Sequence, residues 1–162
     1  MPHIHEKIDF TAEAFIVYNN KVLLRMHDKF KIWLSVGGHI ELDEDPVEAV
    51  VREAKEEVGL NIKVVGEVRP VENEIYSYRE IIAPRHLGRH DISSTHEHIV
   101  FVYYAYSDTD QVKDSHSEHE RSQTCWATKE DLEKMELLPN VRFYALEALK
   151  EIPFHQSFQA AG

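Results

Sequence analysis

Two short apolar runs near the start of the chain have the composition of β-strands. Residues 12–18 (AEAFIVY) and 21–25 (KVLLR) are rich in aliphatic side chains, and they flank Asn19 and Asn20. Asparagine tolerates the positive φ of a two-residue turn, so the pattern predicts a β-hairpin. Further strands are predicted, from their apolar and β-branched content, over residues 61–68, 98–106 and 124–127.

A helix with clear start and stop signals is predicted from residue 46. Asp45 suits the N-cap, Pro46 the first helical position and Glu48 the third position of a capping box, while Gly59 favours a C-terminal stop. At about 100° per residue, one side of this helix gathers apolar residues and should pack on a sheet. These residues are Val47, Val50, Val51, Ala54 and Val58.

The remaining pattern predicts two short helices and one long loop. The helices span residues 129–135, capped by Thr128, and 141–152, capped by Asn140. Residues 69–97 show no regular period and are predicted to form a long irregular loop. Strands that alternate with two or three helices indicate an α/β or α+β sandwich with a mixed sheet.

Composition and charge narrow the class of protein. A chain of 162 residues fits one domain, spanning residues 1–162. The formal charge of -11 argues against a nucleic acid or an anionic membrane as a partner. Cys125 is the only cysteine, which excludes an intrachain disulfide and favours a reducing compartment. With no apolar signal core and no membrane-length apolar run, a cytoplasmic location is expected, and a homodimer is left open.

The chain is rich in histidine, with eleven in all. Four of them fall within a short stretch, at His86, His90, His96 and His98. Exposed loop histidines are the expected explanation, because no cysteine or carboxylate pattern completes a zinc signature. Ligation of a metal ion is the alternative.

The predicted helix also carries a crowded set of charges. Glu53, Glu56 and Glu57 lie within two turns on a stripe beside the apolar one. Like charges at this spacing destabilise a helix, which a bound multivalent cation would explain, although the fragment alone could equally be an ordinary solvated helix face. Mg²⁺ and Mn²⁺ prefer such oxygen ligands. Arg52 could fix a neighbouring carboxylate or contact phosphate, and the Gly37–Gly38 pair indicates a tight turn or a close approach to a ligand.

Residues 38–60 (GHIELDEDPVEAVVREAKEEVGL) resemble the Nudix box, the signature of the Nudix hydrolase family. The family pattern is Gly, five residues, Glu, seven residues, Arg-Glu-aliphatic-any-Glu-Glu-any-Gly-aliphatic. This chain fills it with Gly38, Glu44, Arg52, Glu53, Ala54, Glu56, Glu57, Gly59 and Leu60. Ala54 is smaller than the usual aliphatic residue, and Val36 stands where proline is frequent, but neither departure touches the charged positions.

The resemblance implies an α/β/α sandwich that hydrolyses a nucleoside diphosphate linked to another group, with Mg²⁺ or Mn²⁺. It makes metal ligands of the three box glutamates and of the Gly38 carbonyl, with Glu53 also a candidate general base. Arg52 and Glu44 become supporting residues. Family members often add a carboxylate from outside the box, for which Glu97 is the first choice and Glu118 or Glu120 the second.

The segment 69–97 is expected to decide the substrate. Tyr76 and Tyr78 could stack on a nucleobase, while three arginines could bind terminal phosphates, although either set could equally serve packing or the surface. The arginines are Arg79, Arg85 and Arg89.

Two other functions remain as alternatives. One is a non-catalytic Nudix-like module that binds a nucleotide as a regulatory ligand, although such modules tend to lose box carboxylates. The other is a diphosphate isomerase on the same fold, which requires a reactive cysteine. Cys125 is the sole candidate, and its place in a predicted strand favours a small buried residue instead.

Overall fold

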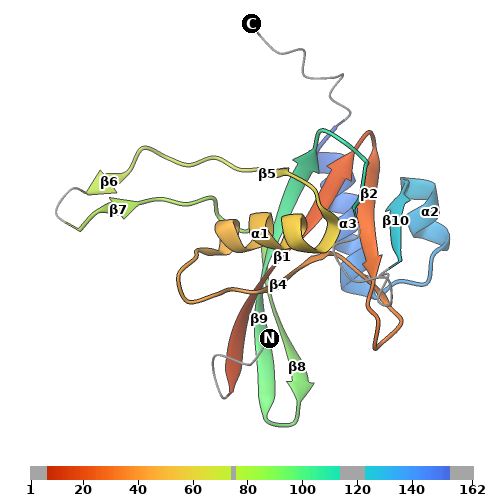
Figure 1. Ribbon diagram of the computed structural model, residues 1–162, viewed down its shortest axis with the longest axis horizontal. Helices are drawn as coiled ribbons and strands as arrows, with labels where there is room; N and C mark the ends of the chain where they lie inside the picture. The colour runs from red at the N-terminus through yellow and green to blue at the C-terminus, as the bar shows by residue number, and fades with distance from the viewer. Residues whose placement is uncertain (1–6, 74–75, 114–122, 154–162) are drawn as a thin grey trace, which may run out of the picture.

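The structure is a computed structural model that describes residues 7–73, 76–113 and 123–153 (Figure 1). Within these residues, eight strands form one sheet. They are β1 (Ile8–Tyr18), β2 (Lys21–Met26), β3 (Trp33–Leu34), β4 (Val36–His39), β5 (Ile62–Val64), β8 (His86–Ser93), β9 (His96–Ser107) and β10 (Thr124–Ala127). A separate two-stranded sheet joins β6 (Glu72–Asn73) to β7 (Tyr78–Arg79). The helices are α1 (Pro46–Val58), α2 (Lys129–Lys134) and α3 (Pro139–Glu151).

The large sheet is mixed. Its centre is the parallel pair β1 and β9, which runs in register from Ile8 opposite Glu97 to Val17 opposite Tyr106. All other strand pairs in this sheet are antiparallel. The strand order is β10-β2-β1-β9-β5, with β4 also paired to β1, β3 to β2 and β8 to β9. Helix α1 covers one face, and α2 and α3 lie on the other side (Figure 1). The predicted α/β/α sandwich with a mixed sheet is confirmed.

Strict alternation along β1 sends its side chains into two separate cores. Ala12, Ala14 and Ile16 pack under α1, whereas Phe15 and Val17 pack under α3. A strand buried on both faces needs apolar residues at successive positions, and the sequence supplies them. Because the two faces are distinct, the position of a residue in a strand decides which face its side chain meets.

The turn residues of the first hairpin and the capping residues of α1 are as predicted. Asn19 and Asn20 take φ values of 45° and 59°, which the turn between β1 and β2 requires. Asp45 accepts hydrogen bonds from the amides at the start of α1, and Glu48 closes the capping box. Gly59 ends the helix in the left-handed region at φ 69°.

Other predictions were wrong in part. The supposed loop 69–97 contains strand β8, most of whose side chains are exposed, so no apolar period marks it. The last helix begins at Pro139, in the first helical position, so Asn140 lies inside the helix and does not cap it. Val51 is 40% exposed instead of facing the core.

None of the helices in the described parts of the chain has the length and hydropathy that crossing a membrane requires.

Gly37 and Gly38 do not form the tight turn that was one of two options for them; both lie within β4. They are small because other groups approach closely. A Cβ atom on Gly37 would overlap the backbone of β1 at Ala12 and Glu13, and a Cβ atom on Gly38 would overlap the Glu53 carboxylate. The close approach is therefore to the protein's own atoms on both sides of β4.

These two contacts predict different costs for the same substitution. Gly37→Ala should lower the free energy of unfolding by about 1–3 kcal/mol, because it pushes on backbone that cannot rotate away. Gly38→Ala should cost less, because the group in its way is the end of the Glu53 side chain, which can move at the expense of its hydrogen bond from Arg52. Urea unfolding of the two variants beside the wild type checks this order. Equal losses, or a larger loss for Gly38→Ala, would contradict it.

Candidate active site

Helix α1 lies across β4 and gathers its charges around one guanidinium. Arg52 donates from Nε and Nη2 to the two Glu44 oxygens, at 2.9 and 2.7 Å. Its Nη1 donates to Glu53 Oε1 at 2.9 Å and to Glu56 Oε2 at 3.0 Å, and its Nη2 also donates to the His39 carbonyl at 3.0 Å. Of the two roles predicted for Arg52, the structure shows the pairing with carboxylates. The arginine thus fixes the rotamers of three glutamates at once.

Glu53 is the most buried of these carboxylates, with 7% of its surface exposed. It points from α1 toward the bare backbone of Gly38. Burial raises the pKa of Glu53, and the hydrogen bond from Arg52 offsets part of that rise. Among the described residues only Arg52 donates to it, and only at Oε1.

Glu57 is held from two sides. Arg25 of β2 donates to Oε1 and pairs with it, and the Gly37 amide donates to Oε2 at 3.2 Å. Burial nevertheless raises the pKa of Glu57 to about 7, with the Arg25 charge lowering it and the Glu53 charge raising it. The positive charge of Arg25 therefore offsets only part of the cost of burying this carboxylate.

The donor set fits a hard divalent cation. Glu53 and Glu57 are buried carboxylates whose raised pKa values show that their ionised forms lack compensation, which a dication would supply. Glu56 is on the same side of α1, with a side chain that is 60% exposed and held beside Glu53 by Arg52. Three carboxylate oxygens, completed by water, suit Mg²⁺ or Mn²⁺.

A pH dependence follows for the metal-free protein. The folded pKa of Glu57, about 7, lies above its ordinary value of 4.5, so between these values the unfolded chain releases the proton first. The contribution of Glu57 to stability should therefore be complete below pH 4.5 and fall by up to about 3 kcal/mol as the pH rises through 7. Urea unfolding in a chelating buffer across this window measures the fall.

Glu57→Gln is the matched variant for this measurement, because it keeps the side-chain volume and removes the titrating group. The variant should lose most of the fall, while the smaller contribution of Glu53 remains. A stability difference between the wild type and Glu57→Gln that does not change with pH across the window would show that the Glu57 carboxylate is adequately compensated.

The structure brings Glu44 into the group but not Glu97. The Arg52 hydrogen bond lowers the pKa of Glu44, which also accepts from the Glu41 amide at 2.9 Å. Gly38 and Phe101 both lie opposite Ala12. Glu97 is four residues from Phe101, which is about 13 Å along β9. There Glu97 pairs with Arg89. The second choices, Glu118 and Glu120, lie outside the described residues.

The residues proposed to bind substrate are not gathered into one place. Tyr76 and Tyr78, 82% and 52% exposed, belong to the β6–β7 hairpin, which Figure 1 shows at the end of an extended segment away from α1. Arg79 ends the same hairpin. Arg85 pairs with Glu151 of α3. Arg89 is engaged by Glu97, so two of the three arginines already have carboxylate partners.

Sequence reasoning missed Arg25 and an apolar cavity. Arg25 lies two positions from Leu23, whose side chain faces α1, so strand alternation could have placed it on the helix side. The cavity, of about 310 Å³, lies beside the start of α1 and carried no sequence signal, because its walls come from distant segments. It is lined by Asp9, Phe10, His39, Ile40, Glu41, Leu42, Pro46 and Phe101.

Cys125 lies away from the carboxylates. It is opposite Leu24 in the β10–β2 pair and packs against the core under α3, on the face of the sheet that α1 does not cover. Burial raises the pKa of its thiol, which disfavours a nucleophilic thiolate. The position argues against the isomerase alternative.

Comparison with known proteins finds a family model and a solved structure that match this chain. The family model for the NUDIX domain matches residues 10–149. The chain is 37% identical to a solved hydrolase of the NUDIX family from Clostridium perfringens, with a TM-score of 0.77, covering 88% of this chain and 97% of that one. Among proteins with curated descriptions, none matches the chain significantly.

More distant structures share the fold. A MutT NUDIX hydrolase from Burkholderia pseudomallei is 22% identical with a TM-score of 0.60, covering 91% of this chain and all of that one (100%). An ADP-ribose pyrophosphatase from Streptococcus suis is 15% identical with a TM-score of 0.55, covering 88% of this chain and 90% of that one. At these identities the likeness extends to the architecture alone.

Proposed function

The chain belongs to the Nudix hydrolase family, whose enzymes act on diphosphate bonds, and on that premise we propose that it cleaves a nucleoside diphosphate linked to another group with the help of Mg²⁺ or Mn²⁺. The observation that carries the proposal is the undercompensated carboxylate group of α1. Glu53 and Glu57 are buried with raised pKa values beside an arginine that is already shared by three glutamates.

The residue roles follow from how each side chain is held. Glu53, Glu56 and Glu57 would bind the cation, with the Gly38 carbonyl as a further oxygen. Arg52 would position Glu53 and Glu56, and Glu44 would hold Arg52 by its bidentate pair. When bound, the cation neutralises charge that develops at phosphorus and lowers the pKa of water. An acidic protein can accept a polyphosphate at such a site because the local charge is reversed.

We assign removal of the water proton to Glu53. Both oxygens of Glu57 accept hydrogen bonds, from Arg25 and from the Gly37 amide, whereas Oε2 of Glu53 accepts none among the described residues. Its raised pKa makes the ionised carboxylate a better base than an exposed one. Arg52 holds the other oxygen of Glu53 and so fixes the direction of the unengaged one.

The cavity beside α1 supports a nucleoside as part of the substrate. Its apolar walls include Phe10 and Phe101, whose ring centroids lie 6.3 Å apart, and Ile40 and Pro46 join the box sequence to it. A volume of about 310 Å³ is at the low end for a ligand pocket and suits a base more than a large group. Tyr76 and Tyr78 would contact the substrate only if their hairpin closed over this side.

A phosphate-release screen tests the proposal. Nucleoside triphosphates, nucleotide sugars, ADP-ribose and dinucleoside polyphosphates are offered with Mg²⁺, with Mn²⁺ and with a chelator. Turnover of at least one diphosphate is expected with metal and none without it. Water labelled with ¹⁸O then identifies the phosphorus that is attacked. Binding that raises the unfolding temperature, without release of any product across the whole panel, would favour the regulatory-module alternative.

A further inference from the structure

A second group of metal-binding side chains lies at the end of the sheet that α3 does not reach. It consists of Asp9 on β1, His39 on β4, His90 on β8, and His96 and His98 on β9, and is called the histidine cluster below. Asp9 is opposite His98, and His98 is opposite His90, so these three form one row across the strands. The expectation that His86, His90, His96 and His98 lie in loops is wrong, because all four lie in strands, although His90 is exposed as expected.

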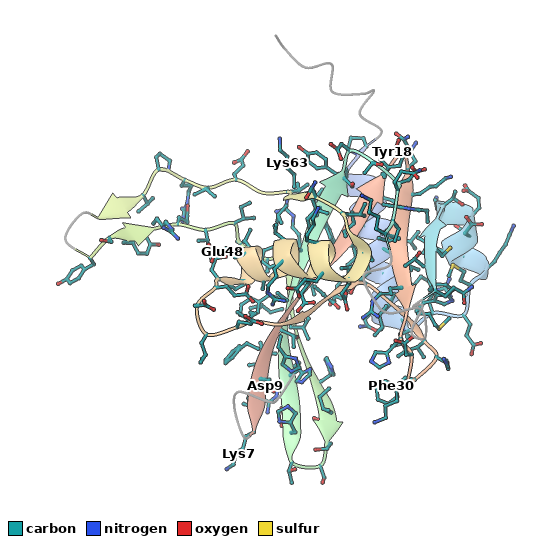
Figure 2. The ribbon with its side chains drawn as sticks, in the orientation of Figure 1. Lys7, Asp9, Tyr18, Phe30, Glu48 and Lys63 are labelled. Carbon is teal, nitrogen blue, oxygen red and sulfur yellow. The ribbon has the colours of Figure 1, made fainter. Side chains whose placement is uncertain are left out.

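The centre of the cluster is a buried carboxylate. The Asp9 side chain is only 1% exposed. Nε2 of His96 lies 3.1 Å from Asp9 Oδ2, and Nε2 of His39 lies 3.4 Å from the same oxygen. Figure 2 shows Asp9 on the lower part of β1, where nitrogen-bearing rings gather beside it.

The histidine rings crowd around His98. Its ring centroid lies 4.9 Å from that of His39, 5.3 Å from that of His96 and 5.4 Å from that of His90. One ligand atom each from Asp9, His39 and His98 falls within 4.8 Å of the others. Three donors from three different strands therefore surround one small volume.

The histidine cluster is separate from the carboxylate group of α1. Gly38 faces α1, since a Cβ there would meet Glu53. Its neighbour His39 therefore projects from the opposite face of β4. Only the His39 backbone reaches the first site, through its carbonyl, which accepts from Arg52.

We propose that Asp9, His39 and His98 bind a transition-metal ion of the Zn²⁺ type, with His96 holding the Asp9 carboxylate in place. Two imidazole nitrogens and one carboxylate oxygen match the ligands that Zn²⁺ takes in open four-coordinate sites, whereas Mg²⁺ prefers oxygen alone. Tetrahedral bonds of about 2.1 Å place ligand atoms about 3.4 Å apart, so the side chains must close slightly around the ion.

Zinc binding should tie β1, β4 and β9 together where no helix covers them. In a buffer that contains Mg²⁺, equilibrium dialysis against Zn²⁺ should load one more equivalent on the wild type than on His98→Gln. The affinity at this site should fall at least about 100-fold in the variant. Zn²⁺ should raise the unfolding temperature of the wild type by more than that of His98→Gln. Co²⁺ should give the intense d–d bands of a four-coordinate site in the wild type alone.

Controls separate this site from other histidines and from hydrolysis. His86→Gln removes a histidine from the same sheet face, where it contacts Tyr104 and Glu147 instead of the cluster, and should keep the extra equivalent. Glu57→Gln should keep it too, because it changes only the α1 site. If His98→Gln does not fold, His39→Gln, with a 20% exposed side chain, takes its place. Equal zinc loading of the wild type and the folded variant would overturn the proposal.

Discussion

Glu57→Gln is expected to lower kcat at least about a thousandfold while the protein stays folded. The amide keeps the volume of the side chain, and its oxygen can still accept from the Gly37 amide. It removes the negative charge that the cation would need at the most strongly perturbed carboxylate of the site. Steady-state kinetics with the best substrate of the screen, at saturating Mg²⁺, measure the loss.

Glu48→Gln is the matched control for this experiment. It makes the same chemical change on the same helix, where Glu48 accepts from the Asp45 amide in the capping box. Glutamine fills that capping position equally well, so kcat should stay near that of the wild type. A Glu57→Gln variant with undiminished kcat would remove Glu57 from the metal site. Equal losses in both variants would point to the charge of the helix as a whole.

Arg52→Ala is expected to impair both stability and activity. Its guanidinium is 21% exposed and contacts Glu44 and Glu53, whose side chains are 11% and 10% exposed. Removing it leaves two nearly buried carboxylates facing each other without a counter-charge, which costs about 3 kcal/mol of folding free energy. The glutamates also lose their fixed rotamers, so kcat/KM should fall about 10–100-fold.

Arg52→Lys separates charge from shape. Lysine keeps the positive charge but cannot donate to Glu44, Glu53 and Glu56 together, as the planar fork does. Stability should return to within about 1 kcal/mol of the wild type, because the charge is restored. The kcat/KM should stay low, because the orientation of the three glutamates is not restored. Full rescue of kcat/KM by lysine would show that only the charge of Arg52 matters.

Much of the architecture around α1 could be predicted because its signals are local. Asp45, Pro46, Glu48 and Gly59 act on neighbouring backbone groups, so reading them needs no tertiary structure. The same holds for the asparagine turn of the first hairpin. The spacing of the box glutamates likewise places them on one helix face, whatever that face packs against.

What could not be predicted depends on contacts between distant segments. Strand alternation places Arg25 on the side of the sheet that faces α1, but its pairing with Glu57 depends on how the helix packs on the sheet, which the sequence near Arg25 does not record. Strand β8 has few buried side chains, so its pairing with β9 leaves no apolar period to recognise. Glu97 lies four residues along β9 from the position that is level with Gly38, and this offset depends on the parallel register of β1 and β9. Asp9 joins His98 through that same register.

The parallel register also sets an order on folding. Strand β1 ends at Tyr18, and its central partner β9 begins only at His96, so the pair closes a loop that contains all of α1. Contacts this remote in sequence form slowly, because the chain loses loop entropy before it gains them. During synthesis, α1 and its carboxylates emerge from the ribosome well before β9 exists. Until β9 pairs with β1, the nascent helix can pack only on the strands that precede it, and its glutamates remain hydrated.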